Sequence, residues 1–175
     1  MSSFLNDHEV IDRVYYASYS SAQGEVFIAS SDRAIVFLAF QIPDIDHTRE
    51  LSLLFPESAL VASEHRLHLV AFDALKNKGD QRSIPLFTTG TAFQKSVWLE
   101  LLHIPYGERR TYAQIAQNIG RPHAYRAVGT AVGANRIAVL IPCHRVVPAD
   151  GSIGQYRWGS AIKSQLLSKE SSSGV

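Results

Sequence analysis

Cysteine is nearly absent from this sequence, because Cys143 is the only one among 175 residues. A single cysteine excludes an internal disulfide framework and any zinc site that needs several cysteines. Long hydrophobic runs are also missing, since no apolar stretch approaches the roughly 20 residues that span a bilayer. The first ten residues lack the apolar core of a secretory signal. We therefore expect a protein that does not cross a membrane and works in the cytoplasm, or in the nucleus of a eukaryote.

A strong net charge is lacking too, but the net charge of +1 hides an asymmetry between the two halves of the chain. Residues 1–85 contain 7 Lys and Arg against 12 Asp and Glu, whereas residues 86–175 contain 10 against 4. A basic half beside an acidic half is typical of a protein whose basic part meets a polyanion. Unevenly distributed solvated charge is the alternative explanation, and the charges alone do not decide between the two.

The N-terminal half has the pattern of a strand-rich domain. Short runs of β-branched and aromatic residues, separated by polar turns, cover residues 14–19, 26–29 and 34–40. Such runs predict an antiparallel meander. Apolar residues at helical spacing predict a helix around 57–76. Residues 77–85 are polar and contain Gly and Pro, which is typical of a linker between domains.

The C-terminal half has the pattern of a helical domain. Thr91 and Gln94 have the spacing of a capping box, in which both side chains satisfy backbone donors at a helix start. Thr111 and Gln114 repeat this spacing. A third helix is predicted to open at Pro122. The second and third helices, joined by a short Gly-Arg-Pro turn, form a helix-turn-helix pattern.

The predicted third helix carries two glycines on one face, Gly129 and Gly133. Each glycine costs a helix interior about 1 kcal/mol relative to alanine, so we expect something to compensate. Either another helix packs closely against this face, or a nucleic-acid backbone approaches it. Arg126 on the same helix favours the second interpretation.

The single cysteine follows the apolar run Ile137–Ile141, which predicts a buried strand with the thiol at its end. A lone cysteine is usually a small buried hydrophobic residue. However, His144 and Arg145 come directly after Cys143, and positive groups favour the reactive thiolate. We therefore interpret Cys143 as a nucleophile, while His144 by itself could equally be a base or a surface imidazole.

The segment around the cysteine, IPCHRVV over residues 141–147, resembles the active-site signature of the O6-alkylguanine-DNA alkyltransferases. Further segments resemble blocks of this family in the same order. They are GTAFQKSVW (90–98), IPYGERRTYAQIA (104–116), RAVGTAVGAN (126–135) and YRWGSAIKSQLLSKE (156–170). The resemblance is strong over 86–170 and weaker over 10–85. It is closer to the bacterial adaptive-response type than to the vertebrate type.

The resemblance implies an α+β protein of two domains. The first, residues 1–85, would be ribonuclease-H-like with a small antiparallel sheet. The second, residues 86–170, would be mostly helical, of the winged-helix or helix-turn-helix type, and would carry the cysteine. We expect the serine-rich residues 171–175 to be a disordered tail.

The resemblance also implies repair of DNA in a single turnover. The thiolate would attack the alkyl carbon on O6 of guanine, or possibly on O4 of thymine, and the stable thioether would end the reaction without a cofactor. The implied catalytic residues are Cys143, His144, Glu170, Asn135 and Tyr112. In this network Glu170 orients His144, which accepts the thiol proton through a water, and Asn135 ties the helix-turn-helix to the cysteine turn.

The implied partner is double-stranded DNA that contains O6-alkylguanine, and the target base must leave the duplex to react. Arg126 would fill the vacated space, while Tyr112 would assist rotation of the nucleotide and protonate the leaving guanine. The implied DNA-binding positions are Tyr112, Arg126, Ala127, Gly129 and Thr130. The implied wall of the alkyl and base pocket consists of Val146, Ile153, Tyr156, Arg157 and Trp158. The bulk of the last two predicts a preference for small alkyl groups.

Two departures from the family pattern limit these expectations. The N-terminal half has no cysteine, so we expect no zinc and no other metal. The length of 175 residues leaves no room for the regulatory domain to which some bacterial members are fused, and we expect a monomer.

Three other functions stay open. Alkyltransferase-like proteins bind the same lesions without chemistry, but they have Trp where this chain has Cys143. A helix-turn-helix regulator would need base-reading side chains, which are scarce over residues 127–133. A cysteine hydrolase would need an activated water. Replacing Cys143 by Ser would separate these cases, because only the alkyltransferase would keep DNA binding and lose alkyl transfer.

Overall fold

The computed structural model describes residues 10–76 and 83–172. The chain divides into two units. Unit 1 consists of the residues up to Thr89 together with Arg136–Leu140, and unit 2 consists of Gly90–Asn135 and the residues from Ile141 onward. Of the linker predicted over 77–85, residues 77–82 lie outside the described residues.

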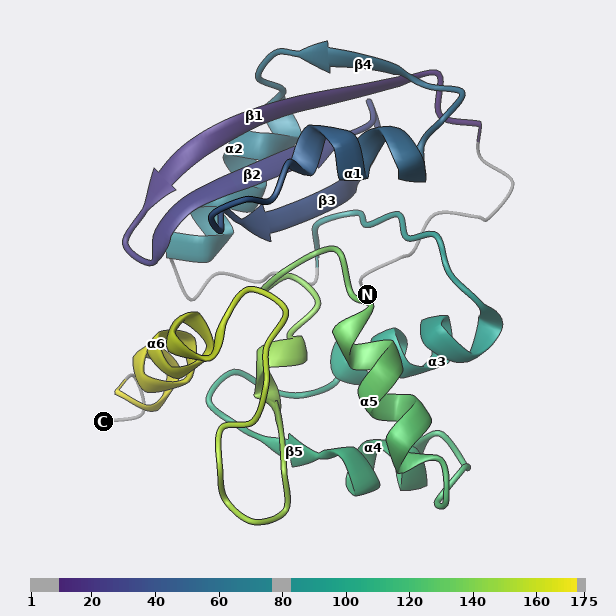
Figure 1. Cartoon of the computed structure of the whole chain (residues 1–175), viewed down its shortest axis with the longest axis vertical. Helices are drawn as coiled ribbons and strands as arrows, with labels where there is room; N and C mark the ends of the chain where they lie inside the picture. The colour runs from purple at the N-terminus through teal and green to yellow at the C-terminus, as the bar shows by residue number, and fades with distance from the viewer. Residues whose placement is uncertain (1–9, 77–82, 173–175) are drawn as a thin grey trace. The chain divides into compact units, whose positions relative to one another are not determined.

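Unit 1 is built on a four-stranded sheet with the order β3-β2-β1-β4 (Figure 1). The strands are β1 (Arg13–Ser21), β2 (Gly24–Ser30), β3 (Ile35–Phe40) and β4 (Ala59–Ala62). The first three pair antiparallel, which confirms the predicted meander. The fourth strand runs parallel to β1, so the sheet is mixed, and the prediction of an antiparallel sheet was wrong in this respect.

The prediction of one helix around 57–76 was also wrong, because this stretch contains a strand before its helix. Leu60, assigned to the helix by its spacing, lies in β4 opposite Val14 of β1. Helix α2 begins only at Arg66 and ends at Lys76. Pairing with a strand more than 40 residues away overrides the local helical spacing, which carries no information about that partner.

A short helix that the sequence analysis did not predict, α1 (His47–Leu54), completes unit 1. The Asp46 side chain caps its start by accepting hydrogen bonds from the backbone N–H groups of Thr48 and Arg49. Figure 1 shows α1 in front of the sheet and α2 behind it. The sheet is therefore covered on both faces, which explains why all six residues of β3 are buried.

The apolar run before the cysteine is buried, as predicted, but it is not a strand. Ile137 makes a single parallel bridge to Leu38 of β3. The chain then turns, with Val139 in the left-handed region at φ 65°. The run thus adds to the core of unit 1, and the thiol does not sit at the end of a strand.

Unit 2 is mostly helical and contains one two-stranded parallel ladder. Its α-helices are α3 (Ala92–Leu101), α4 (Tyr112–Asn118), α5 (Tyr125–Gly133) and α6 (Ser160–Ser171). The ladder joins β5 (Arg110–Thr111) to β6 (Val146–Val147), and a 3-10 helix covers Cys143–Arg145. Both predicted capping boxes are confirmed, at the starts of α3 and α4.

The predicted pair of short helices corresponds to α4 and α5, which pack against each other and on α3. Gly120 ends the first of them with φ +72°, a conformation that favours glycine. The second helix begins at Tyr125, three residues later than predicted, because Pro122 lies in the preceding turn. The Trp98 indole of α3 donates to the carbonyl of Ala131, which fixes α5 against α3.

The chain end differs from the predicted tail. Ser171 is the last residue of α6, so the expected disordered segment does not begin there, and residues 173–175 lie outside the described residues. The predicted α+β class is confirmed, with a helix-covered mixed sheet in one unit and helices in the other. Over residues 10–76 and 83–172, every helix is too short or too polar to cross a bilayer.

Candidate active site

Cys143 is the first residue of the 3-10 helix in unit 2, and its side chain is buried. The amide of Asn135 donates from Nδ2 both to the Cys143 Sγ (3.1 Å) and to the carbonyl of Ile141 (3.1 Å). Asn135 is the last residue of unit 2 before the chain enters unit 1, and Ile141 is the first after its return. The amide therefore joins the two ends of this excursion and fixes the thiol beside the end of α5.

The thiol is not activated in the way the sequence predicted. Burial raises the pKa of Cys143, and the hydrogen bond from Asn135 and the charge of Lys163 only partly oppose this rise. Arg145, expected to favour the thiolate, instead pairs with Glu170. The cation that acts on the thiol is thus Lys163, a residue that the sequence analysis did not single out.

His144 and Glu170 form a buried pair, as expected from the family. The His144 Nε2 lies 2.8 Å from Oε1 of Glu170. Burial raises the pKa of Glu170, but hydrogen bonds from His144 and Arg145 outweigh it and bring this pKa to about 2. Burial lowers the pKa of His144, although Glu170 acts against it. The pair is therefore a neutral imidazole that donates from Nε2 to a carboxylate.

The other nitrogen of this imidazole is free to accept a proton. His144 Nδ1 is buried and has no hydrogen-bond partner among the residues that the structure describes. When Nε2 carries the hydrogen that Glu170 accepts, Nδ1 carries the lone pair. The carboxylate thereby selects the tautomer that a general base requires.

Arg145 holds the carboxylate in place, a role that the sequence analysis missed. Its Nε donates to Glu170 Oε2 (3.0 Å) and its Nη2 to Oε1 (2.9 Å), which is a bidentate pair. Its Nη1 donates to the carbonyl of Ile104 (2.8 Å). Glu170 also accepts the backbone N–H of Gly107 through Oε2 (3.2 Å). The end of α6, the 3-10 helix and the turn after α3 therefore meet at one carboxylate.

Lys163 is a second residue that sequence reasoning missed. Its Nζ donates to the carbonyls of Val146 (2.7 Å) and Gln155 (3.2 Å). A signal was present in the sequence, because Lys163 lies seven residues before Glu170 and shares a helix face with it. Leucines at 166 and 167 lie on the same face and are buried, which marks it as the inward face of α6.

A pocket of about 430 Å³ opens beside the thiol. It is lined by Tyr112, Gly129, Val132, Gly133, Cys143, Gln155, Tyr156 and Arg157. Of the five positions expected to form its wall, Tyr156 and Arg157 line it. Val146 is instead buried in the β5–β6 ladder, and Ile153 is half-buried outside the lining. Trp158 lies edge-on behind Tyr156 (5.1 Å between ring centroids), so its bulk supports the wall without narrowing the pocket.

Two tyrosines of the pocket interact with the cysteine. Burial raises the pKa of Tyr112, and the charge of Cys143 adds to the rise. The same two causes, in the same order, raise the pKa of Tyr156 well above 10. The Tyr156 hydroxyl is buried without a hydrogen bond that meets normal geometry. Both phenols therefore stay protonated near neutral pH and can donate a proton or a hydrogen bond into the pocket.

The two glycines of α5 do not serve close helix packing. A Cβ on Gly133 would meet no atom within 4 Å, and one on Gly129 would only reach the Tyr112 ring at 3.8 Å. Of the two explanations for these glycines, the structure leaves the approach of a molecule from outside. Both line the pocket, so the approaching molecule would reach the thiol along this face.

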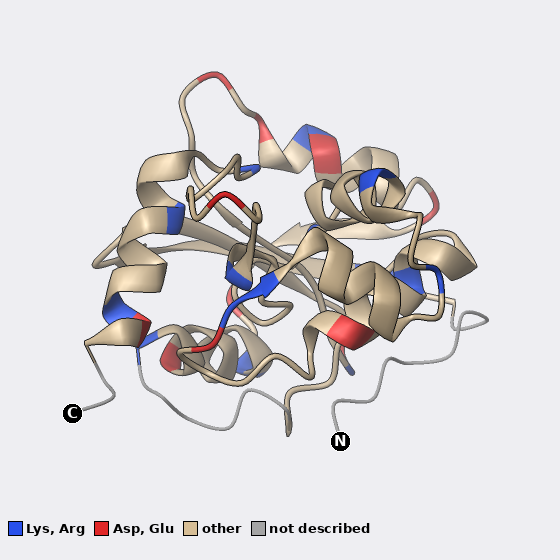
Figure 2. Cartoon of the chain, turned by 90° about the horizontal axis from the view of Figure 1, so that it is seen from below, with Lys and Arg blue, Asp and Glu red and all other residues tan. Residues whose placement is uncertain are grey.

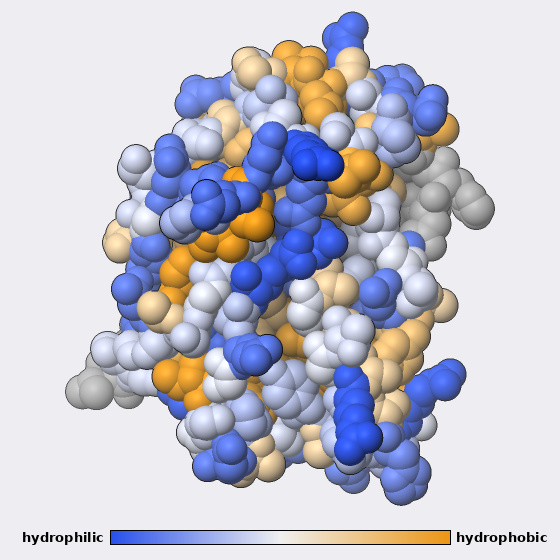
Figure 3. Space-filling model, viewed as in Figure 1, coloured by the Kyte–Doolittle hydropathy of each residue, from blue (hydrophilic) through white to orange (hydrophobic). Residues whose placement is uncertain are grey.

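The outer face of α5 carries the remaining positions expected to bind DNA. Arg126, Ala127 and Thr130 are exposed. The Arg126 guanidinium lies 5.9 Å from the Tyr125 ring centroid, and the Thr130 hydroxyl donates back to the carbonyl of Arg126. Figure 2 shows the basic residues of the chain as separate patches rather than one band, and Figure 3 shows mixed, mostly pale colours around α5. The face thus combines small residues with one exposed arginine.

Comparison with known proteins places these features in a family. Residues 92–172 match the family model described as "6-O-methylguanine DNA methyltransferase, DNA binding domain". The chain is 36% identical over 161 residues to the inducible methylated-DNA–protein-cysteine methyltransferase of Bacillus subtilis, covering 90% of each chain. It is 39% identical over 162 residues to the bifunctional transcriptional activator/DNA repair enzyme Ada of Escherichia coli, covering 90% of this chain but 45% of Ada. The chain thus spans about half the length of that relative.

A solved structure shares the fold. The crystal structure of Mycobacterium tuberculosis OGT in complex with DNA matches with a TM-score of 0.73 and 31% identity. The match covers 91% of this chain and 93% of that one. With a full-length relative at 36% identity as well, the resemblance seen in the sequence is confirmed, and the chain belongs to the methylated-DNA–protein-cysteine methyltransferase family.

Proposed function

We propose that this protein repairs DNA by moving an alkyl group from O6 of guanine, or from O4 of thymine, to the sulfur of Cys143. The observation that carries the proposal is the placement of a buried thiol at a pocket, on the same 3-10 helix as a neutral histidine oriented by a carboxylate. The names of the relatives support the same chemistry. Because nothing in the site is suited to cleave a thioether, each molecule acts once.

The proposed chemistry balances without a cofactor or a metal. The Cys143 thiol gives its proton, through a water, to the unpaired Nδ1 of His144, and the resulting imidazolium is stabilised by Glu170. The thiolate attacks the alkyl carbon, the S–C bond forms and the C–O6 bond breaks. Guanine leaves as an anion and takes a proton from a donor, for which we propose the Tyr112 hydroxyl. The raised pKa of Tyr112 keeps that proton available.

The partner in this proposal is double-stranded DNA from which the damaged nucleotide is extruded. Unstacking the base costs a few kcal/mol, and Arg126, exposed on α5, would occupy the vacated space. The small residues Ala127, Gly129 and Thr130 would allow the DNA backbone to come close to the helix. Since phosphate contacts dominate such binding, affinity should be sequence-tolerant and should fall with salt.

The pocket wall would decide which alkyl groups are accepted. Tyr156 and Arg157 line the pocket, and we propose that they contact the alkyl group and the base. Val146, Ile153 and Trp158, which the family resemblance adds to the wall, would act from behind it or only after a change of the loop.

The finer assignments of fold and organisation belong to the same proposal. We assign unit 1 to a ribonuclease-H-like domain and the C-terminal part to a winged-helix domain, with the boundary near residue 85. The mixed sheet with helices on both faces supports the first assignment, and the α4–α5 pair with the short β5–β6 ladder supports the second. We further propose that the protein acts as a monomer.

The test is the mass of the intact protein after mixing with an oligonucleotide that contains one O6-methylguanine. We expect a gain of about 14 Da, the replacement of a thiol hydrogen by a methyl group, that saturates at one per protein and maps to Cys143. The Cys143→Ser variant should bind the same DNA and gain no mass.

Other outcomes would identify the other functions. Lesion-specific binding without a mass shift would make the protein a non-catalytic module that recognises alkylated DNA. Sequence-specific binding to undamaged DNA would make it a helix-turn-helix regulator. Either result would remove the catalytic roles from Tyr112, His144 and Glu170.

A further inference from the structure

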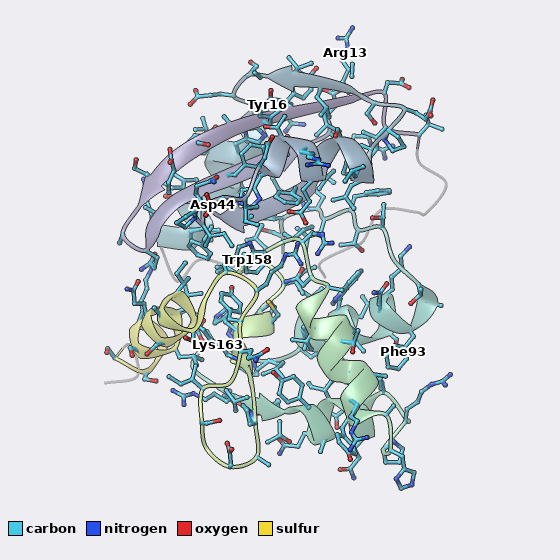
Figure 4. The ribbon with its side chains drawn as sticks, in the orientation of Figure 1. Arg13, Tyr16, Asp44, Phe93, Trp158 and Lys163 are labelled. Atoms are coloured by element: carbon cyan, nitrogen blue, oxygen red, sulfur yellow. The ribbon has the colours of Figure 1, made fainter. Side chains whose placement is uncertain are left out.

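Lys163 is a buried cation whose position the proposed chemistry has not used. Its side chain is 1% exposed on α6 (Figure 4). The Nζ donates to the backbone carbonyls of Val146 and Gln155, and among the residues the structure describes no carboxylate lies within ion-pair distance of it. A buried ammonium with only carbonyl partners is costly, so a compensating anion is expected.

The group that can supply this negative charge is the Cys143 thiolate. The charge of Lys163 lowers the pKa of Cys143, and the charge of Cys143 raises that of Lys163. The other ionisable groups around the thiol supply no free cation. Arg145 is paired with Glu170, burial keeps His144 neutral, and Tyr112 and Tyr156 are phenols.

The two carbonyls that Lys163 holds belong to two segments that shape the site. Val146 follows the 3-10 helix of the cysteine, and Gln155 lies in the loop that lines the pocket. This loop presses on the strand side at Gly154, where a Cβ would come within 2.8 Å of Pro148 and φ is +72°. The Lys163 ammonium is therefore the polar tie between the nucleophile and the pocket wall.

We propose that Lys163 is a positioning residue for the transfer reaction: its ammonium ties the pocket loop to the cysteine turn and supplies the positive charge that stabilises the Cys143 thiolate. The link to alkyl transfer rests on the proposed function, whereas the link to thiol reactivity does not. Lys163 keeps its proton and touches the substrate at no step.

The test uses the single cysteine and a reagent that needs no DNA. Iodoacetamide is attacked by the thiolate, an S–C bond forms and iodide leaves, so the rate at each pH reports the thiolate fraction. The variants are Lys163→Gln, Lys163→Met and Lys163→Arg. Lys169→Gln is the matched control, because it removes the same charge from the same helix at a half-buried position.

We expect the Gln and Met variants to react about tenfold more slowly at pH 7, with the midpoint of the pH profile moved up by about one unit. Lys163→Arg should recover most of the rate, because it keeps the charge, and Lys169→Gln should match the wild type. A wild-type pH profile in folded Lys163→Gln would overturn the proposal. So would a loss that Lys163→Arg shares in full, since that pattern indicates a packing role alone.

A measurement on the unmutated protein covers the case in which the variants fail to fold. The Nζ resonance of Lys163 is titrated by NMR before and after Cys143 is capped with iodoacetamide. Coupling between two charges is reciprocal, so capping should lower the pKa of Lys163. An unchanged titration would overturn the proposal.

Alkyl transfer from O6-methylguanine DNA separates this proposal from the proposed function. At saturating DNA the transfer rate constant of Lys163→Gln should fall, while its Kd for DNA should change no more than that of Lys169→Gln. If the wild type transfers nothing but the iodoacetamide profiles shift as expected, the proposed function fails and the role of Lys163 on the thiol stands.

Discussion

The two units of this protein bury different kinds of polar group. Among the described residues, the buried polar side chains of unit 1 are Ser30, Ser31, His47 and His68, all of which are neutral at pH 7 or easily kept so. Those of unit 2 are Asn135, His144, Arg145, Lys163 and Glu170, of which three carry charge. Charged groups are almost never buried unless they are paired. The difference shows which unit was shaped by packing and which by chemistry.

The histidines of unit 1 illustrate the packing solution. His68 donates or accepts at the Tyr19 hydroxyl (3.3 Å), and its ring lies edge-on to that of His65. Burial, followed by the charge of His65, lowers the pKa of His68 to about 4. This imidazole thus stays neutral and is packed as an aromatic ring. In unit 2, by contrast, His144 faces a carboxylate whose own pKa is held at about 2.

Breaking the charged cluster of unit 2 should have the largest effect. In Glu170→Gln the bidentate partner of Arg145 is lost and a buried guanidinium is left uncompensated, which costs about 3–5 kcal/mol. The same change removes the group that orients His144, so we expect the rate of alkyl transfer to fall about a hundredfold or more. Urea unfolding and single-turnover transfer measure the two effects. A variant as stable and as fast as the wild type would contradict the assigned role of the carboxylate.

The same residue should give unit 2 its acid sensitivity. The pKa of Glu170 is about 2 in the fold against an ordinary value of 4.5, so the unfolded chain takes up this proton first as the pH falls. The stability that the carboxylate contributes is complete above about pH 4.5 and is lost as the pH approaches 2. Unfolding free energies of the wild type and Glu170→Gln should therefore converge over this range. Parallel curves would show that the carboxylate is not ionised in the fold.

Unit 1 should lose stability at a higher pH, which sharpens the contrast. His68 has a pKa of about 4 in the fold against 6.5 in the unfolded chain, so its contribution is complete above about pH 6.5 and is lost as the pH falls toward 4. Replacing it by leucine should flatten the unfolding free energy between these values. Hydrogen exchange at β1 and α2, which it packs between, would localise the effect. Unchanged pH dependence in His68→Leu would show that other groups control this window.

A glycine substitution should separate stability from function within unit 2. Gly133→Ala places a methyl group where no atom lies within 4 Å and removes a poor helix former, so we expect a gain of about 0.5–1 kcal/mol in unfolding free energy. The added methyl group projects at the pocket, so binding of DNA that contains O6-methylguanine should weaken. Unfolding by urea and fluorescence anisotropy measure the two. Tighter binding would contradict the proposed approach along α5.

The smallest expected effect comes from the two capping boxes. Thr91→Ala and Thr111→Ala each remove a side chain that accepts a backbone N–H, at a cost of about 1 kcal/mol. The losses in Tm should be similar. Only Thr111→Ala should also slow alkyl transfer, because the next residue is Tyr112 of the pocket. Equal transfer rates in the two variants would show that the start of α4 does not control this tyrosine.

Local signals predicted the local structure well. Both capping boxes, the three-stranded meander and the turn at Gly120 rest on residues a few positions apart, and each is present. The errors concern elements whose partner is far along the chain. Strand β4 pairs with β1 across more than 40 residues, and the run Ile137–Ile141 bridges to β3 across about 100. No spacing within either segment encodes such a partner.

The site divides in the same way. The motif around Cys143 and its resemblance to a family named the nucleophile, the histidine and the distant glutamate without any structure. The motif did not reveal that Arg145 serves Glu170 rather than the thiol, or that Lys163 is buried. Both depend on which groups meet in a buried space, since an arginine two residues from a cysteine can point to either neighbour.

The sequence by itself determined the secondary structure around the capping residues, the family and the reactive atom, because these depend on residue types at short spacing and on a seven-residue signature. The tertiary structure alone decided the state of the thiol. Burial raises its pKa, Asn135 and Lys163 oppose the rise, and Glu170 leaves one histidine nitrogen free. These are differences in solvation and in charge distance between groups as far as 35 residues apart in the chain, and only folding sets them.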